Sequence, residues 1–175
     1  MSQPDLSEVV SASVQDVTAA LVAGKPVLTC GNGGSASDAL HVSGELVGRF
    51  FRERRALNVV CLNSNVTVMT AWANDVDFTS VFSRQVEAHG RDGGVLWGFS
   101  TSGNSKNVVD AFEKAASMGM KTIAMTGSSP GLLGELAHHL ISVPGDDAPS
   151  AQNLHVLLYH YMCGAIEELA TSSGL

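Results

Sequence analysis

The pattern that most constrains the fold of this chain is an apolar, strand-like run that ends in a turn of small residues and then opens a helical segment. It occurs twice. Residues 26–30 lead into the turn Gly31-Asn32-Gly33-Gly34-Ser35, and residues 95–99 lead into Ser100-Thr101-Ser102-Gly103-Asn104-Ser105. A strand that passes through a short turn into a helix is half of a βαβ unit, so the pattern predicts a parallel sheet. Such turns also offer free backbone N–H groups and hydroxyls at a helix N-terminus, where phosphate binds readily.

Strand-like runs alternate with helical patterns along the whole chain. Strands are predicted at residues 26–30, 57–62, 95–99, 121–125 and 139–143, and helices at 4–23, 35–49, 65–73, 79–89, 105–117, 132–137 and 151–170, with Ser35 as the N-cap of the second helix. We therefore expect one domain over residues 1–175, with an α/β, three-layer, doubly wound fold of the flavodoxin-like kind. Its five-stranded parallel sheet would be flanked by helices on both faces. Ligands of such sheets bind at the carboxyl ends of the strands near a switch point, where both turns fall.

The composition argues against several kinds of partner. The net charge is −7 and no run of Lys or Arg is present, so we expect no nucleic acid partner. No apolar run reaches the roughly 18 residues that span a bilayer, and the acidic, polar N-terminus lacks a signal-peptide pattern, so we expect no membrane association. Charged residues make up 15% of the chain, a low share that suggests surface buried in an oligomer.

The cysteines and the one basic cluster are read as structural features. Cys30, Cys61 and Cys163 lie in apolar segments without metal-type spacing, so we expect buried free thiols and a cytoplasmic location. The basic cluster is typical of a solvated helix end, with a subunit contact or an anion contact as the alternative. It consists of Arg49, Arg52, Arg54 and Arg55.

Taken alone, the glycine turn leaves several interpretations open. Its spacing also fits a dinucleotide-binding loop, but that fingerprint needs an acidic residue at the end of the second strand, and here the strand ends at Leu62-Asn63. A Walker-type loop is excluded because no Lys follows the glycines. A tight turn without a ligand remains the plain alternative. The Ser/Thr turn is more specific, since helix capping accounts for one of its four hydroxyls and phosphate binding accounts for all of them.

Two helices carry polar residues on otherwise apolar segments. His41 and Glu45 are one helical turn apart on one face. Such a pair is often an ordinary surface contact, yet Glu45 in this apolar setting needs a partner, a proton or a metal ion. The last helix carries Gln152, His155 and His160, and a single such histidine is usually a satisfied core residue. Gln152 and His160 are roughly 12 Å apart along a helix, so their spacing alone does not indicate a shared metal.

Together these motifs resemble the phosphoheptose isomerase family of the sugar-isomerase (SIS) fold. The resemblance covers residues from about 4 to 170 and rests on the glycine turn, His41 and Glu45, Asn74-Asp75, the Ser/Thr turn, and the set Gln152, His155 and His160. It implies an aldose-ketose isomerase that converts sedoheptulose 7-phosphate to D-glycero-D-manno-heptose 7-phosphate, the first step of heptose biosynthesis, for example for lipopolysaccharide. It also implies one zinc ion per subunit and a homotetramer with sites at the subunit interfaces.

The resemblance implies a role for each matching residue. Glu45 and His160 would be the acid/base pair and, with His41 and Gln152, the zinc ligands. Ligands that come from two subunits would remove the spacing problem of Gln152 and His160. The remaining matches would bind the substrate and its phosphate, and they are Asn32, Gly33, Gly34, Ser35, Asn74, Asp75, Ser100, Thr101, Ser102, Ser105 and again Gln152.

The chain departs from the family pattern at two places. The family commonly shows Arg-Ile-Gln-Glu around the glutamine, where this chain has Ser150-Ala151-Gln152-Asn153. The family's Gly-Asn-Asp is Ala73-Asn74-Asp75 here. The first departure changes the side chains on either side of the glutamine, and with them the fit to a substrate at that loop.

Two other functions share the fold. A non-enzymatic SIS protein that associates with a replication initiator would lack the family glutamate and the last histidine, which this chain keeps as Glu45 and His160. Another SIS isomerase, acting on hexose or hexulose phosphates, fits less well with the His41, Glu45, Gln152 and His160 set. In the favoured reaction a base removes a proton from the carbon beside the carbonyl, an enediol(ate) forms, and the proton returns to the neighbouring carbon. Glu45 is the predicted base and His160 the partner acid.

Overall fold

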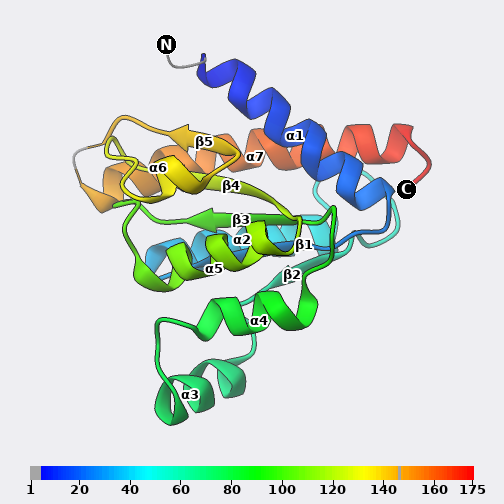
Figure 1. Ribbon diagram of the computed structural model, residues 1–175. Helices are drawn as coiled ribbons and strands as arrows, with labels where there is room; N and C mark the ends of the chain where they lie inside the picture. Colours follow the sequence, from blue (N-terminus) through cyan, green and yellow to red (C-terminus); the bar gives the residue numbers. More distant parts are fainter. Residues whose placement is uncertain (1–4, 146) are drawn as a thin grey trace.

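The computed structural model describes residues 5–145 and 147–175. Within them, a parallel sheet of five strands runs in the order β2-β1-β3-β4-β5 (Figure 1). β2 lies on one side of β1 and β3 on the other, so the winding changes direction between β1 and β3. This order is that of flavodoxin-like sheets, and the predicted doubly wound α/β fold is confirmed. The strands are β1 (Val27–Gly31), β2 (Val59–Cys61), β3 (Val95–Phe99), β4 (Lys121–Thr126) and β5 (His139–Ser142).

Helices cover both faces of the sheet (Figure 1). One face is covered by α1 (Leu6–Val22), α2 (Gly34–Val47) and α7 (Ala148–Ser172), and the other by α4 (Val81–His89), α5 (Lys106–Ser117) and α6 (Leu133–Leu136). A further helix, α3 (Val66–Asp75), extends beyond α4. The sheet therefore divides the core into two apolar layers. The central strand β3 contributes to both, with Trp97 in the first layer and Leu96 in the second, because successive strand side chains point to opposite faces.

The predicted helices and strands are present within a few residues of their expected bounds, and the differences have local causes. α2 begins at Gly34 with Gly33 as its N-cap, so the prediction of Ser35 as the N-cap is wrong; Ser35 is buried in the first turn. α7 begins at Ala148 rather than at 151, because the Asp147 side chain accepts a hydrogen bond of 2.8 Å from the Ser150 backbone N–H. Residue 4, the predicted start of the first helix, lies outside the described residues.

Both small-residue turns lie beside one another at the carboxyl edge of the sheet. β1 and β3 are neighbours, and Gly31, the last residue of β1, is in register with Phe99, the last residue of β3. Each strand therefore enters its turn at the same level of the sheet, and α2 and α5 begin from there. This edge, at the switch point, is where the fold predicts a ligand.

The three cysteines are buried free thiols, as predicted. Burial raises the pKa of Cys163 to about 12, so this thiol stays protonated at neutral pH. The cytoplasmic location inferred from these residues stays a prediction. Among the described residues, none of the helices has the length and apolar character needed to cross a bilayer.

Candidate active site

The Ser/Thr turn leaves the N-terminus of α5 open. Ser105 is the N-cap residue, yet its hydroxyl does not cap the helix, because Ser105 Oγ lies 3.0 Å from Ser100 Oγ instead. The turn requires glycine at position 103, where φ is +64° and a Cβ would collide with the carbonyl oxygen of Pro130. The hydroxyls of the turn and the first N–H groups of α5 are thus arranged for an anion, with the positive end of the helix dipole behind them.

The glycine turn is held by a side-chain amide at the end of β2. Asn63 accepts a hydrogen bond of 3.2 Å from the Gly31 N–H and donates one of 2.9 Å to the Gly31 carbonyl. This amide stands where a dinucleotide-binding fold places the carboxylate that holds the ribose. The structure therefore agrees with the sequence-based argument against a dinucleotide.

The two turns are joined by a reciprocal pair of amides, which sequence reasoning missed. Asn32, in the glycine turn, donates to Asn107 Oδ1 at 2.8 Å, and Asn107 Nδ2 donates to Asn32 Oδ1 at 2.9 Å. Asn107 lies in the first turn of α5 and is buried. Because each amide satisfies the other, Asn32 is fixed between the two turns. No local pattern marks this pair, since its members belong to distant parts of the chain.

α2 and α7 lie side by side and run in the same direction. The Gln152 side chain lies over Gly34, where a Cβ would collide with the amide, while His160 reaches His41. From Gly34 to His41 is two helical turns, or about 10 Å of helix. Within one chain, Gln152 therefore belongs with the glycine turn, and His160 belongs with His41 and Glu45.

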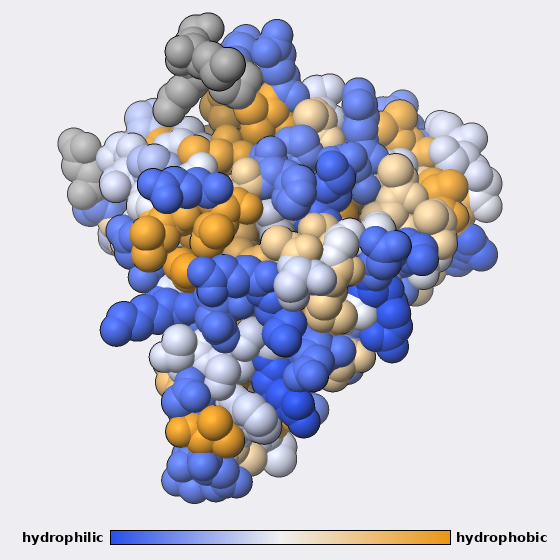
Figure 2. All heavy atoms as spheres, viewed as in Figure 1, coloured by the Kyte–Doolittle hydropathy of each residue, from blue (hydrophilic) through white to orange (hydrophobic). Residues whose placement is uncertain are grey.

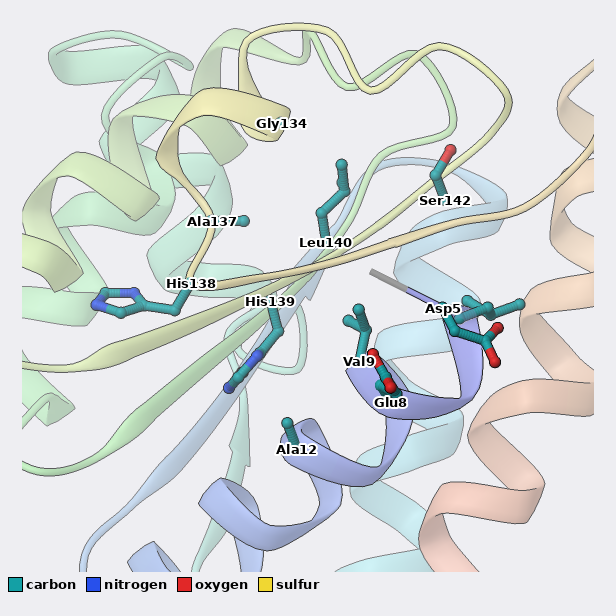
Figure 3. A pocket seen from close by; sticks show the side chains of 11 residues that line it. Asp5, Glu8, Val9, Ala12, Gly134, Ala137, His138, His139, Leu140 and Ser142 are labelled. Atoms are coloured by element: carbon teal, nitrogen blue, oxygen red, sulfur yellow. The ribbon is translucent and has the colours of Figure 1, made fainter. Parts of the chain in front are cut away.

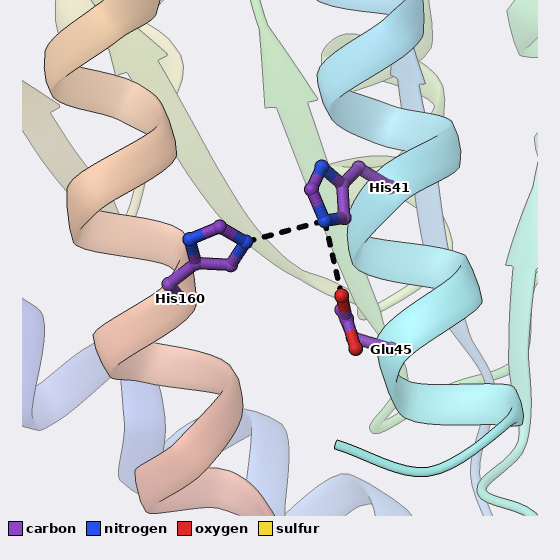
Figure 4. Close-up of side chains that lie close together, drawn as sticks. All are labelled: His41, Glu45 and His160. Carbon is purple, nitrogen blue, oxygen red and sulfur yellow. Dashed lines mark hydrogen bonds and ion pairs between the residues drawn. The ribbon is translucent and has the colours of Figure 1, made fainter.

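His41, Glu45 and His160 converge between α2 and α7 (Figure 4). His41 Nε2 is 3.0 Å from Glu45 Oε1 and 3.2 Å from His160 Nε2, and one ligand atom of each residue lies within 4.8 Å of the others. The side chains of His41 and Glu45 are 43% and 23% exposed, so a small molecule can reach them. The helical spacing on α2 predicted the pair of His41 and Glu45, whereas His160 joins them through the packing of α7 against α2. We call these three residues the triad.

The donor atoms of the triad fit a zinc ion. Two imidazole nitrogens and a carboxylate oxygen are ligands that zinc prefers, and tetrahedral ligands at about 2.0–2.1 Å lie roughly 3.3 Å from one another. The separations of 3.0 and 3.2 Å from His41 Nε2 are close to that value. Three protein ligands leave a fourth position open, as catalytic zinc sites do. Gln152 lies about two helical turns away in the same chain, and its role as a ligand stays a prediction.

The other ring nitrogen of His41 contacts Tyr159, a residue that sequence reasoning did not single out. The Tyr159 hydroxyl lies 3.0 Å from His41 Nδ1, and Tyr159 is buried. Burial and the nearby charge of Asp38 raise the pKa of Tyr159 well above its usual range. Burial also raises the pKa of Asp38 to about 6, against the opposing effects of His41 and Tyr159. A buried hydroxyl and a buried carboxyl therefore lie behind His41.

A buried carboxylate holds the segment that follows α2. Glu167 on α7 accepts backbone hydrogen bonds from Phe50, Phe51 and Arg52 at 3.0, 2.7 and 3.0 Å. Its Oε1 lies 3.1 Å from Arg54 Nε, and both side chains are buried. The segment reaches the triad, because the Phe50 ring stacks on His160 with 5.7 Å between centroids and an Arg54 Nη atom donates to the backbone carbonyl of residue 45 at 3.0 Å.

The basic cluster therefore differs in part from the expected solvated helix end. α2 ends at Val47, so the cluster lies in the segment after the helix, and Arg54 is buried in an ion pair rather than solvated. Arg49 and Arg52 do fit the expectation, since each is more than half exposed and pairs loosely with a carboxylate at 3.4 Å. The partner of Arg54 comes from the last helix, so no local pattern could indicate it.

Asn74 and Asp75 lie at the C-terminal end of α3, a helix that Figure 1 shows apart from α2 and α7. Both are exposed, and Asn74 Nδ2 donates to Asp75 Oδ1 at 2.8 Å. α3 packs against α4 and has no buried residue, and apolar atoms lie open at its surface in the space-filling view (Figure 2). The predicted contact of these two residues with a substrate stays a prediction.

Three histidines outside the triad make structural contacts. His155 is a core residue, but it is satisfied only in part: Nε2 lies 3.1 Å from a backbone carbonyl of β4, the buried Nδ1 has no hydrogen-bond partner among the described residues, and burial lowers its pKa. His139 Nε2 lies 2.7 Å from Asp16 Oδ2, and His138 Nδ1 lies 2.9 Å from Thr122 Oγ1. His138 and His139 line a separate cavity of about 800 Å³ between α1 and β5, where the His139 ring points toward α1 and the His138 ring away from it (Figure 3). Both histidine rings are already held by these contacts, so we do not take this cavity as a candidate active site.

Comparison with known proteins links this arrangement to one family. The sequence matches the SIS domain family model over residues 3–127, a stretch that contains both turns and two members of the triad. A phosphoheptose isomerase from Helicobacter pylori strain P12 is 45% identical over 95% of this chain and 86% of its own length. That likeness extends through most of α7 and so includes the third member.

Solved structures give the same result. A phosphoheptose isomerase from Francisella tularensis superimposes with a TM-score of 0.88 at 33% identity, covering 92% of this chain and 86% of that one. A phosphoheptose isomerase from Neisseria gonorrhoeae superimposes with a TM-score of 0.86 at 38% identity, with the same coverage of 92% and 86%. The likeness in sequence and in fold therefore spans the sheet, both turns and the helices that carry the triad.

Proposed function

The chain belongs to the SIS-domain family of phosphoheptose isomerases, and from this membership we propose that it converts sedoheptulose 7-phosphate to D-glycero-D-manno-heptose 7-phosphate. At the coarser level the chain is a sugar-phosphate isomerase of the heptose pathway. The observation that carries the proposal is the triad itself. A carboxylate and two imidazoles converge between α2 and α7, about two turns of helix from the glycine turn, and the neighbouring Ser/Thr turn leaves the N-terminus of α5 without a side-chain cap.

In the proposed reaction Glu45 is the base and His160 the acid. Glu45 removes a proton from C1 of the ketose while the carbonyl oxygen at C2 takes a proton from His160, which gives an enediol. His160 then takes the hydroxyl proton at C1, and Glu45 returns its proton to C2, so the aldose forms and both side chains are restored. Zinc held by His41, Glu45 and His160, with Gln152 as a further predicted ligand, would polarise the carbonyl and hydroxyl oxygens.

The two turns would hold the rest of the substrate. Ser100, Thr101, Ser102 and Ser105 would bind the phosphate at the open N-terminus of α5, which supplies orientation away from the reacting carbons. About 10 Å of α2 separates the glycine turn from His41, a length that an extended seven-carbon phosphate spans. The residues along this path would contact the sugar, and they are Asn32, Gly33, Gly34, Ser35 and Gln152.

We further propose that the protein assembles as a homotetramer in which a second copy completes each site. α3 has no buried residue, and Val66 on it is 68% exposed. Phe51, in the segment held by Glu167, is 78% exposed. Exposed apolar side chains are typical of protein contacts where they gather into patches, and an oligomer would cover both. A neighbouring copy would bring Asn74, Asp75 or Gln152 to the triad, and sedimentation velocity measures the oligomer directly.

Turnover of sedoheptulose 7-phosphate tests the reaction. The purified, metal-analysed protein is incubated with the ketose, and the aldose is followed by NMR with and without a chelator. We expect turnover that is lost on chelation and restored by zinc. Turnover that survives chelation keeps the isomerase and removes the metal from the mechanism. Absence of turnover with zinc present would instead favour an SIS module that binds a protein, which a pull-down with a replication initiator examines.

A carboxylate variant tests the assignment of the base. Glu45→Gln should lower kcat by about 10²–10⁴-fold while the protein stays folded, because the amide cannot accept the proton. Glu53→Gln is the matched control, since this carboxylate is 89% exposed and pairs with Arg49 outside the site. A near-normal kcat in Glu45→Gln would refute the assignment.

A further inference from the structure

Tyr159 lies behind the triad rather than in it. Its hydroxyl is 3.0 Å from His41 Nδ1, whereas His41 Nε2 faces Glu45 and His160. The rings of His41 and Tyr159 meet edge to face, with 5.2 Å between centroids and 66° between planes. Tyr159 directly precedes His160 on α7, so consecutive residues of one helix contact the two nitrogens of the same imidazole.

The Tyr159 hydroxyl is placed for a polar contact. Tyr159 is 1% exposed and its ring packs edge to face on Phe99, so water cannot freely satisfy the hydroxyl. His41 Nδ1 provides the partner. Asp38, one turn before His41 on α2, is 5% exposed, and its buried Oδ2 has no hydrogen-bond partner among the described residues. A phenol that accepts a hydrogen bond from an imidazole can donate its own proton to a carboxylate nearby.

We propose that Tyr159 is a positioning residue that fixes His41 as a metal ligand. Its hydroxyl accepts the Nδ1 proton, which leaves the Nε2 lone pair directed at the point where Glu45 and His160 converge. The proposal rests on the metal role of the triad proposed above. A neutral imidazole binds metal through one nitrogen while the other carries the proton. Loss of a partner of that second nitrogen typically weakens metal binding by about 10–100-fold.

The test compares two tyrosines on the same helix. Tyr159→Phe removes one oxygen and keeps the ring in the core. Tyr161→Phe makes the same change at a side chain that is 67% exposed, and is the matched control. The zinc dissociation constant of each protein is measured at one pH by competition with a chromophoric chelator. The visible spectrum of the cobalt-substituted proteins reports the ligand geometry separately from turnover.

We expect zinc to bind Tyr159→Phe about 10–100-fold more weakly, with a changed cobalt spectrum, and Tyr161→Phe to match the unmutated protein. Equal zinc affinity in Tyr159→Phe and the unmutated protein overturns the proposal, and so does an unmutated protein that binds no zinc. Thermal unfolding of the metal-free proteins separates loss of fold from loss of metal. If Tyr159→Phe is less stable, all three proteins are compared at a lower temperature at which Tyr159→Phe stays folded.

The zinc measurements test the positioning role of Tyr159 separately from the proposed reaction. A protein that binds zinc with the Tyr159 effect but does not turn over sedoheptulose 7-phosphate keeps the positioning role and refutes the substrate. A protein that turns over the substrate with equal zinc affinity in both tyrosine variants keeps the reaction and refutes the positioning role.

Discussion

Glu167 ties α7 to the segment between α2 and β2, and its replacement by glutamine tests how strongly. The carboxylate accepts three backbone hydrogen bonds, at 3.0, 2.7 and 3.0 Å, and faces the buried Arg54 at 3.1 Å. Glutamine keeps the size of the side chain but has one acceptor oxygen. Its NH₂ group would point at backbone N–H donors or at the guanidinium. Glu167→Gln therefore leaves Arg54 buried beside an uncharged, poorly matched group.

The expected loss of stability follows from these contacts. A hydrogen bond to a charged group contributes about 1.5–3 kcal/mol, and removal of one partner of a buried ion pair costs about 3–5 kcal/mol. Because both effects belong to the same carboxylate, they overlap rather than add. We expect Glu167→Gln to lower the free energy of unfolding by about 3–5 kcal/mol. The control is Glu168→Gln, the same change at a side chain that is 64% exposed and 3.4 Å from Arg52, where we expect less than about 1 kcal/mol.

The effect should depend on pH in a defined direction. Burial raises the pKa of Glu167, but the three backbone N–H donors and Arg54 outweigh it, and the net pKa lies below the usual range. An acid with a depressed pKa in the fold adds stability above its unfolded pKa, about 4.3, and that stability is lost as the pH falls through the folded value. The difference between the unmutated protein and Glu167→Gln should be full at neutral pH and shrink below about pH 4.

Urea unfolding followed by circular dichroism measures this difference. The protein concentration is held constant, because subunit association adds to the apparent stability. A loss in Glu167→Gln at pH 7 no larger than that in Glu168→Gln would refute the reasoning. A large loss that stays constant into acid would show that the charge of Glu167 is not its cause.

Two further predictions concern Asp38 and Gly103. Burial raises the pKa of Asp38 to about 6, so the free energy of unfolding of the metal-free protein should fall by up to about 3 kcal/mol as the pH rises from 4 to above 6. Asp38→Asn should lack this fall. A difference between the two proteins in urea unfolding that does not change with pH would contradict the prediction. Gly103→Ala places a Cβ against Pro130 at φ +64°, so KM for the phosphorylated substrate should rise at least about tenfold, and an unchanged KM would show that the turn is not the phosphate site. The matched control, Gly44→Ala, fills an open position in α2 and should raise the free energy of unfolding by about 0.5–1 kcal/mol.

The fold could be predicted because its signals are local. Each buried strand reads as a short apolar run, and glycine or serine turns separate strands from helices, so the alternation is visible without tertiary information. The first residues of the helices were predicted less accurately. Ser35 is a favourable N-cap by residue type, but Gly33 takes that place because the positive φ of +57° there turns the chain into α2.

The candidate site could be predicted in part, for the same physical reason. His41 and Glu45 share one helix, so the helical period alone places them together. His160 and Tyr159 reach His41 because α7 packs parallel to α2, and that alignment depends on the whole core. The amide pair between the turns and the carboxylate that holds the segment after α2 likewise join distant parts of the chain. Sequence reasoning finds chemistry within one element more easily than chemistry between elements.

The packing of α7 against α2 determines when, during synthesis, the triad can be completed. A chain leaves the ribosome from its N-terminus, so α2 emerges early and α7 emerges after all the other described helices. Until α7 docks, His41 and Glu45 lack His160, and the segment after α2 lacks its buried carboxylate. A nascent chain that ends before α7 contains the residues of all five strands and of the glycine turn, but it lacks one of the three donors. Only chains whose synthesis has passed α7 can therefore complete the triad, and a truncated product without that helix lacks one of its three members.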